Sequence, residues 1–435
     1  MPEPASSPRA LLIGMAGSAR LAHALATVGI GLAAGALFLQ RTLGWAGFLA
    51  AVVVALVLML LSYLARQDEI AWRSLLPVSL LVFLVWAAVS LVWSDYKWAT
   101  VGGLAYLLAF TLIALFVAIS RDTIQIVRAF GDVLRVALGA SLGIEVFSGI
   151  LIDAPLPFLG VHGALGTLGP ISGIEPSRDQ LGLVAIIGAI SFATEHRTRS
   201  VPRLVSVLSL ILAGLCIVLT QSPVIAFATI VVGIAAAVIY GVRRVRPERR
   251  QAWQFAVLGL AVAASVLLWV FRSPVITLFN ASGTLDFRID LWRRVIDLAT
   301  LNGLQGWGWV GPWRTEIFPF SVLNTAVRPT DSALNAFLDI WLQLGAVGVV
   351  IFLGMVGLAF SRSWLLAGAR RSVVYAWPAA ALVALIIVSL AESSILSEFG
   401  WMTFVICCTK ASQELSWRSA LRSASNATHL PPERR

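Results

Sequence analysis

The sequence predicts an all-α polytopic membrane protein with about twelve transmembrane helices and both termini in the cytoplasm. Three observations predict this class. Of the 435 residues, 59% are hydrophobic and only 12% are charged, which excludes a soluble globular domain. Apolar runs long enough to cross a bilayer recur along the chain, and basic residues are concentrated in alternate loops.

The candidate spans are apolar runs of about 18–22 residues, of which the sixth and the twelfth are shorter. They cover residues 22–39, 44–64, 74–92, 99–119, 126–150, 180–194, 203–220, 223–241, 252–271, 333–360, 373–391 and 399–409. We expect no cleavable secretory signal, because no credible small-residue cleavage site follows the first apolar run. No internal repeat is evident.

The basic residues predict the orientation. If the N-terminus is cytoplasmic, most arginines fall on inner loops and tails, as the positive-inside rule requires. The long loops 151–179 and 272–332 then lie outside. The basic cluster at 243–250 is best interpreted as a topology determinant on acidic headgroups, with a nucleic-acid or anionic-lipid patch as the alternative.

The expected domain organisation is simple. Residues 1–20 form a cytoplasmic N-terminal segment, residues 21–410 form the transmembrane domain with its outer loops, and residues 411–435 form a disordered cytoplasmic tail. Three cysteines lie in apolar segments and are expected to serve packing: Cys216, Cys407 and Cys408.

The outer segment 272–332 contains a predicted amphipathic helix, lying on the membrane surface or against the bundle. Its apolar positions recur at spacings of four and three: Leu285, Ile289, Trp292, Ile296 and Ala299. Arg293 has acidic neighbours at three and four positions, Asp290 and Asp297, so local ion pairs satisfy it. The same holds for Arg294.

Arg288 differs from these two arginines. No acidic residue lies three or four positions from it, and Trp292, one turn later, can stack on its guanidinium. An unpaired arginine beside an aromatic ring suits a bidentate grip on phosphate. The sequence therefore predicts that Arg288 binds a phosphate group.

A glycine- and tryptophan-rich run at 306–313 contains the spacing G-x-G-x-x-G. It is not interpreted as a nucleotide site, because no βαβ unit surrounds it. Its three tryptophans indicate an interfacial aromatic belt, or alternatively a platform that stacks on sugar rings.

The segment 328–332 precedes the tenth span, and Pro329 and the polar residues after it predict a helix start. Asp331 is interpreted either as a plain N-cap or as a functional carboxylate. Because Asp331, Asn335 and Asp339 are spaced at four residues, we expect a polar stripe along one helix face.

Residues 335–348 resemble the signature of the bacterial O-antigen ligase and polymerase family, in which His-Asn or His-Ser is followed after nine residues by Gly-x-x-Gly. Asn335, Gly345 and Gly348 fit that spacing. Three further pieces agree, so the resemblance covers most of the chain: Phe287-Arg288 with Leu291-Trp292, residues 177–182 and residues 219–222.

The resemblance implies a GT-C-like fold and an inverting, metal-independent glycosyltransferase without a cofactor. Such an enzyme moves a glycan from a polyisoprenyl-diphosphate carrier, such as undecaprenyl diphosphate, to a hydroxyl of an acceptor glycan or glycolipid. The reaction takes place at the outer face of the bacterial plasma membrane. By the same resemblance, Arg178 and Arg288 would bind the diphosphate, with Trp292, Arg328 and Asn335 as further donor or glycan contacts.

The sequence departs from the family pattern at three positions. Leu334 replaces the histidine, Pro223 replaces an arginine, and Asp179 replaces an asparagine. Because leucine cannot move a proton, another group is needed as the base. We favour Asp331, with His162 as the second candidate. Three more acids are predicted on the outer side: Glu175, Glu392 and Glu398.

Two other functions are compatible with the sequence. The missing histidine is compatible with an inactive relative that acts as a scaffold in cell-envelope assembly. A lipid-linked oligosaccharide transporter also fits twelve spans, although the charges cluster at one face rather than at the midplane. The sequence does not separate ligase from polymerase, and no nucleic acid is expected as a partner.

Overall fold

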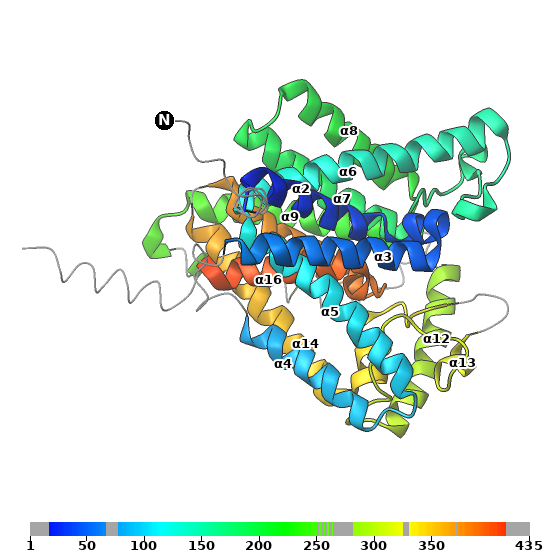
Figure 1. The fold of residues 1–435 in the computed structure, drawn as a ribbon. Helices are drawn as coiled ribbons and strands as arrows, with labels where there is room; N and C mark the ends of the chain where they lie inside the picture. The colour runs from blue at the N-terminus through cyan, green and yellow to red at the C-terminus, as the bar shows by residue number, and fades with distance from the viewer. Residues whose placement is uncertain are drawn as a thin grey trace, which may run out of the picture.

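The computed structural model describes residues 17–66, 77–249, 282–324, 330–370 and 372–414, together with residues 252–254, 256, 259, 260 and 263. These residues form an all-helical bundle (Figure 1). No strand occurs among them beyond an isolated bridge between Leu156 and Val161. The prediction of an all-α protein is confirmed for this part of the chain.

The helices follow the predicted spans closely. Their order is α2 (Ala19–Ala34), α3 (Ala36–Leu64), α4 (Val78–Val89), α5 (Lys97–Ser120), α6 (Thr123–Val146), α7 (Arg178–Thr198), α8 (Arg203–Leu219), α9 (Pro223–Arg244), α12 (Ser282–Leu301), α13 (Phe320–Leu323), α14 (Ala336–Ala369), α15 (Ala376–Ser389) and α16 (Glu398–Glu414). The predicted ninth span, 252–271, lies mostly outside the described residues, as do residues 1–16 and 415–435.

Five of the described helical segments are long and apolar enough to cross a membrane: α3, α5, α6 with the turn after it, α9 and α14. Four shorter helical segments are also apolar: Ala19–Ala34, Val78–Val92, Arg203–Leu219 and Val373–Ser389. The number of spans and the orientation stay predictions. Figure 1 shows the loop between α6 and α7 and the segment 282–324 at one end of the bundle, opposite the start of α2 and the end of α16.

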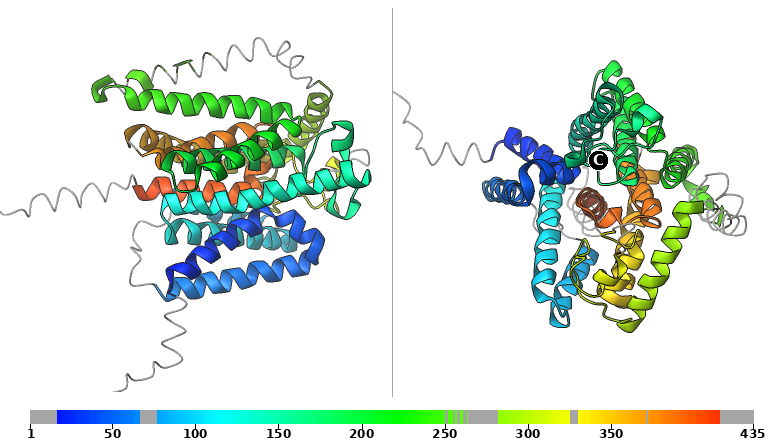
Figure 2. Two further views of the ribbon diagram at one scale, coloured as in Figure 1. Left: turned by 90° about the horizontal axis from the view of Figure 1, so that it is seen from above. Right: turned by 90° about the vertical axis from the view of Figure 1, so that its right-hand side faces the viewer.

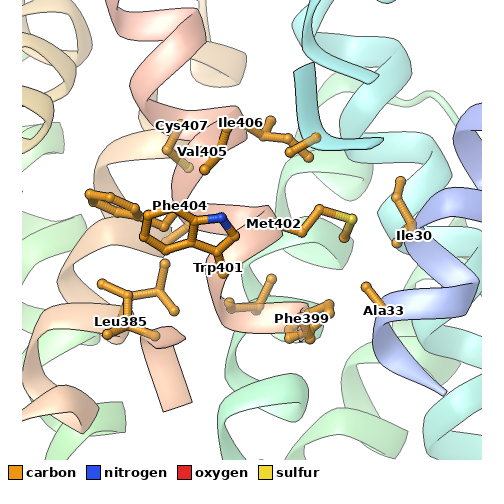
Figure 3. Close-up of a cluster of buried hydrophobic side chains, with 14 of the residues drawn as sticks. Ile30, Ala33, Leu385, Phe399, Trp401, Met402, Phe404, Val405, Ile406 and Cys407 are labelled. Atoms are coloured by element: carbon orange, nitrogen blue, oxygen red, sulfur yellow. The ribbon is translucent and has the colours of Figure 1, made fainter. Parts of the chain in front are cut away.

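The last helix, α16, is the centre of the bundle. It contacts α2, α5, α14 and α15, which surround it in the right-hand view of Figure 2. Trp401, Met402 and Phe404 point in different directions from it into the core (Figure 3), and all three are buried. A helix that is apolar all round is a buried helix, which explains why this short span needs no polar face.

A break at Gly345 divides α14. Its φ is 69° and its ψ is −174°, a conformation that only glycine adopts without strain. A Cβ at this position would lie 2.1 Å from the carbonyl oxygen of Leu304, on the loop that follows α12. The chain therefore needs glycine here for two reasons, the dihedral angles and the close backbone contact.

The loop after α12 satisfies the backbone groups that this break releases. Trp307 and Gly308 donate their N–H groups to the carbonyls of Leu342 and Gln343, at 3.0 and 2.8 Å. In the other direction, the Ala346 N–H donates to the Gly303 carbonyl at 2.8 Å. Such compensation is required in an apolar environment, where an unpaired backbone group costs several kcal/mol.

The tryptophans of this loop are packing residues. Trp309 is 1% exposed and Trp313 is 5% exposed, so the predictions of an interfacial belt or a sugar-stacking platform are wrong for both. The cause is the Gln343 side chain, which accepts from the N–H groups of Val310 and Gly311 and donates to the Gly311 carbonyl. It holds the loop inside the protein.

The amphipathic helix predicted at 285–299 is confirmed as α12, but its buried face was predicted only in part. Leu291, Val295 and Ala299 are buried, whereas Ile296 is 37% exposed. The buried residues form a cluster with residues of α14 and the segment before it. The helix is rotated relative to the prediction because the buried face also includes Arg288, a charged residue that an apolar pattern does not detect.

We predict that Gly345→Ala destabilises the fold strongly, by about 1–3 kcal/mol from the backbone conformation alone, with the contact to Leu304 adding to it. Thermal unfolding of the detergent-purified protein measures this. Gly354→Ala in the same helix is the matched control, because a Cβ there meets nothing within 4 Å. Equal unfolding temperatures for the two variants would contradict the account of the break.

Candidate functional site

The candidate site is centred on Arg288, in the first half of α12. Its side chain is buried, with 6% of the residue exposed. The Nη2 atom lies 2.9 Å from Asp179 Oδ2 on α7 and also contacts Glu392, in the loop between α15 and α16. Three elements that are distant in the sequence therefore meet at one guanidinium group.

The prediction that Arg288 is unpaired was wrong. Its partners are 109 and 104 residues away along the chain, so helix spacing alone does not reveal them. By contrast, the local pairing predicted for Arg293 is confirmed, since its Nη1 lies 3.6 Å from Asp290 Oδ1. A charge taken out of water needs such partners, because desolvation of an unpaired ion costs several kcal/mol.

The start of α7 presents Asp179 to Arg288. Ser177 is the N-cap, and its hydroxyl accepts from the Gln180 N–H at 3.1 Å. Asp179 then lies in the first turn, where the helix dipole favours a carboxylate. The Ser222 hydroxyl, at the start of α9, forms a further hydrogen bond with Asp179.

Glu392 is the second carboxyl at Arg288. Burial raises the pKa of Glu392 well above its ordinary value, and its hydrogen bond to Asp179 raises this pKa further. Arg288 therefore lies between Asp179 and a second carboxyl whose charged form is disfavoured by burial. The Arg288 Nε atom is buried and has no hydrogen-bond partner among the described residues.

The turn between α8 and α9 completes this region. The Gln221 carbonyl accepts from Arg178 Nη1 at 3.5 Å, and the Leu219 carbonyl accepts from the Ile171 N–H at 3.1 Å. Pro223 is the first residue of α9, a position that proline suits because its missing N–H is not needed there. The segments 177–182 and 219–222, which carry part of the family resemblance, thus lie together.

The start of α14 differs from the prediction. The N-cap is Asn335, whose Oδ1 accepts from the N–H groups of Phe337 and Leu338. Asp331 lies four residues before this cap and is exposed, so neither its role as N-cap nor the polar helix stripe is present. The Asp331 backbone carbonyl instead accepts from the Trp313 N–H at 2.7 Å.

Asp339, in the first turn of α14, is buried, and its carboxylate accepts hydrogen bonds that fix the segment before the helix. It accepts from Trp313 Nε1 at 2.6 Å, from the Ala333 N–H at 3.0 Å and from the Ser393 hydroxyl. Trp292 donates its indole N–H to the Ala333 carbonyl at 3.0 Å. Trp292 is therefore tied to the backbone beside position 334.

Leu334, at the family's histidine position, has a left-handed backbone conformation with φ 49°. A residue with a Cβ pays roughly 1–2 kcal/mol for this conformation. Its neighbour Asn335 donates through Nδ2 to the Leu390 carbonyl at 3.0 Å. Position 334 is thereby held beside the loop that carries Glu392.

One of the predicted site residues, His162, is not brought to this region. His162 is exposed in the loop after α6, and no side-chain hydrogen bond or ion pair of the described residues involves it. Arg328 lies outside the described residues. Among the residues that the structure describes, no group of three His, Cys, Asp or Glu side chains could hold a metal ion.

The structure adds functional candidates to those favoured from the sequence. Glu392 was recognised only as one more outer acid, and Asp179 only as a departure from the family pattern. The signal for both was present in the sequence as acids next to span ends. Their pairing with Arg288 is a tertiary contact and required the structure.

Residues 208–353 match the family model described as O-Antigen ligase. The matched segment includes Arg288, Asp331 and Gly345, whereas Asp179 and Glu392 lie outside it. The match confirms the family resemblance found in the sequence and supports a membrane glycan ligase or polymerase. No match to a curated protein was found.

The pKa of Glu175, in the loop before α7, can be tested by experiment. It is buried, and its Oε1 has no hydrogen-bond partner among the described residues. Burial, and then the nearby Glu398 carboxyl, raise the pKa of Glu175 from 4.5 to about 8. The folded protein therefore keeps a proton that the unfolded chain releases, so stability falls as pH rises from about 4.5 to about 8.

We predict that Glu175→Gln removes this pH dependence. The amide mimics the protonated carboxyl, so the variant should gain unfolding temperature over the wild type progressively between pH 5 and pH 8.5. Thermal unfolding across that range measures the difference, with the exposed Glu316→Gln as the control. A difference that is constant with pH would contradict the assignment.

Proposed function

We propose that the chain is a membrane glycosyltransferase that moves a glycan from a polyisoprenyl-diphosphate carrier to an acceptor hydroxyl. The transfer takes place at the outer face of the bacterial plasma membrane, with inversion and without a metal ion. The observation that carries the proposal is the buried Arg288, with an unpartnered N–H, where segments of the family resemblance that are distant in sequence meet.

The main chemical task is to stabilise the leaving diphosphate. A guanidinium is the basic group suited to phosphate binding in apolar surroundings, and the unpartnered Nε–H of Arg288 suits a phosphate oxygen. Arg178, at the first position of α7, adds a second positive charge close to Asp179. Preorganised donors of this kind stabilise developing negative charge without reorganisation at the moment of reaction.

The second task is to deprotonate the acceptor hydroxyl. We propose Asp331 for it, because this exposed carboxylate lies in the segment leading to Leu334 and its backbone is fixed by Trp313. Asn335 is proposed to position the segment, since it both caps α14 and binds the α15–α16 loop.

The inactive relative is the second candidate, and Leu334 is the observation that favours it. A leucine where the family has a base removes the expected proton acceptor. Transfer activity therefore decides between the two candidates.

We predict that Arg288→Lys lowers glycan transfer by about tenfold or more while the protein stays folded. Lysine keeps the charge that compensates Asp179 but lacks the bidentate edge for phosphate, and such charged hydrogen bonds contribute about 1.5–3 kcal/mol each. A reconstituted transfer assay with lipid-linked donor measures this. Arg293→Ala is the control, because its partner is local and exposed, and full activity of Arg288→Lys would place the phosphate grip elsewhere.

We predict that Asp331→Asn gives a folded protein without transfer activity. The structural contact of Asp331 is its backbone carbonyl, which the substitution leaves in place, whereas the amide cannot accept the proton. The measurement is the same transfer assay together with an unfolding temperature. If Asp331→Asn is fully active, the base is another group, and His162→Ala is the next variant to assay.

A further inference from the structure

A second arginine cluster lies at the opposite end of α7 from Arg288. The helix has 21 residues, which at about 1.5 Å per residue separates its ends by roughly 30 Å. Near its last turn, Arg197 lies over the ring of Tyr240 of α9, with 5.4 Å from Cζ to the ring centroid. Arg244 lies over the same ring, also at 5.4 Å.

The contact with Tyr240 orders both arginines without neutralising them. Arg197 Nη1 donates to the Tyr240 hydroxyl at 3.3 Å, and both arginine side chains are exposed. The ion pairs among the described residues involve Arg135, Arg288 and Arg293, and neither of these two. Stacking on an aromatic face leaves the N–H edges of a guanidinium free for an anion.

The neighbouring Arg243 has a different role. It donates to the Ala367 carbonyl at 2.7 Å and to the Ser372 carbonyl at 3.2 Å. These carbonyls lie at the end of α14 and in the turn after it, so Arg243 caps a helix end. Arg370, in the same turn, lies over Tyr375 at 5.8 Å and is exposed, which adds a further positive charge to this end of the bundle.

The surface beside the cluster is apolar. Leu204, directly after the first residue of α8, is 70% exposed, and Ile234, on α9, is 59% exposed. Charged side chains that adjoin an exposed apolar helix face are expected at the depth of lipid headgroups. A soluble anion would contact only the arginines. A phospholipid contacts the arginines with its phosphate and the apolar surface with its acyl chains.

We propose that Arg197, Arg244 and Tyr240 form a binding site for the phosphate of an anionic phospholipid. The guanidinium groups donate N–H groups to the phosphate, Tyr240 holds them in place, and the acyl chains lie along the apolar faces of α8 and α9. An anion placed between the arginines also relieves their mutual repulsion. The site is independent of the transfer reaction at the other end of α7.

The test measures binding of phosphatidylglycerol to the detergent-purified protein, with phosphatidylcholine and inorganic phosphate as comparison probes. We expect phosphatidylglycerol to bind better than phosphatidylcholine and to raise the unfolding temperature. The double variant Arg197→Gln/Arg244→Gln should weaken phosphatidylglycerol binding by about tenfold or more, because two charged contacts are lost. Tyr240→Leu should weaken binding with all charges kept, and Tyr240→Phe should retain it.

The matched control is Arg199→Gln/Arg203→Gln. It removes the same charge from the same end of the bundle, and both of these arginines are exposed. Equal loss of binding in the two double variants would overturn the proposal in favour of diffuse attraction. Equal binding of the two lipids would also overturn it, and so would full competition by millimolar inorganic phosphate. If a double variant does not fold, the comparison of phosphatidylglycerol binding by Tyr240→Leu and Tyr240→Phe still tests the proposal.

Discussion

The buried guanidinium of Arg288 binds Asp179 of α7 and Glu392 of the α15–α16 loop, and this contact holds α12 against both of these elements. The same loop also contacts the start of α14, through the Leu390 carbonyl and the Ser393 hydroxyl. Loss of one partner from a buried ion pair costs about 3–5 kcal/mol, because the other charge is left without compensation. The contact links three elements that are far apart in sequence, and the α15–α16 loop connects them to the start of α14.

Much of the fold could be predicted from the sequence, because spanning helices are defined by composition and length alone. The predicted spans on the described residues correspond to observed helices, and the amphipathic helix α12 is present. The incorrect predictions concern positions where local sequence preferences allow two interpretations. Asp331 and Asn335 are both good N-caps, and tertiary contacts select Asn335, because its Nδ2 binds the Leu390 carbonyl while Asp339 holds Ala333.

The candidate site was predicted only in part, for a physical reason. The sequence showed that Arg288 lacks a partner on its own helix, which remains correct, but not that other elements supply two. Likewise, the tryptophans at 307–313 resemble an interfacial belt, and the contacts of this loop with Gln343 and with the break at Gly345 explain why Trp309 and Trp313 are buried. A broken helix needs backbone partners, and the adjoining loop provides them. Tertiary pairing of this kind leaves no short-range signal.

In the proposed function, Arg288 holds the diphosphate of the lipid-linked donor. The most direct measurement is an experimental structure of the protein in lipid with a polyisoprenyl diphosphate bound. We expect the diphosphate oxygens to lie within hydrogen-bond distance of the Arg288 guanidinium, with Arg178 nearby. A diphosphate bound elsewhere, with Arg288 still enclosed by Asp179 and Glu392, would contradict it.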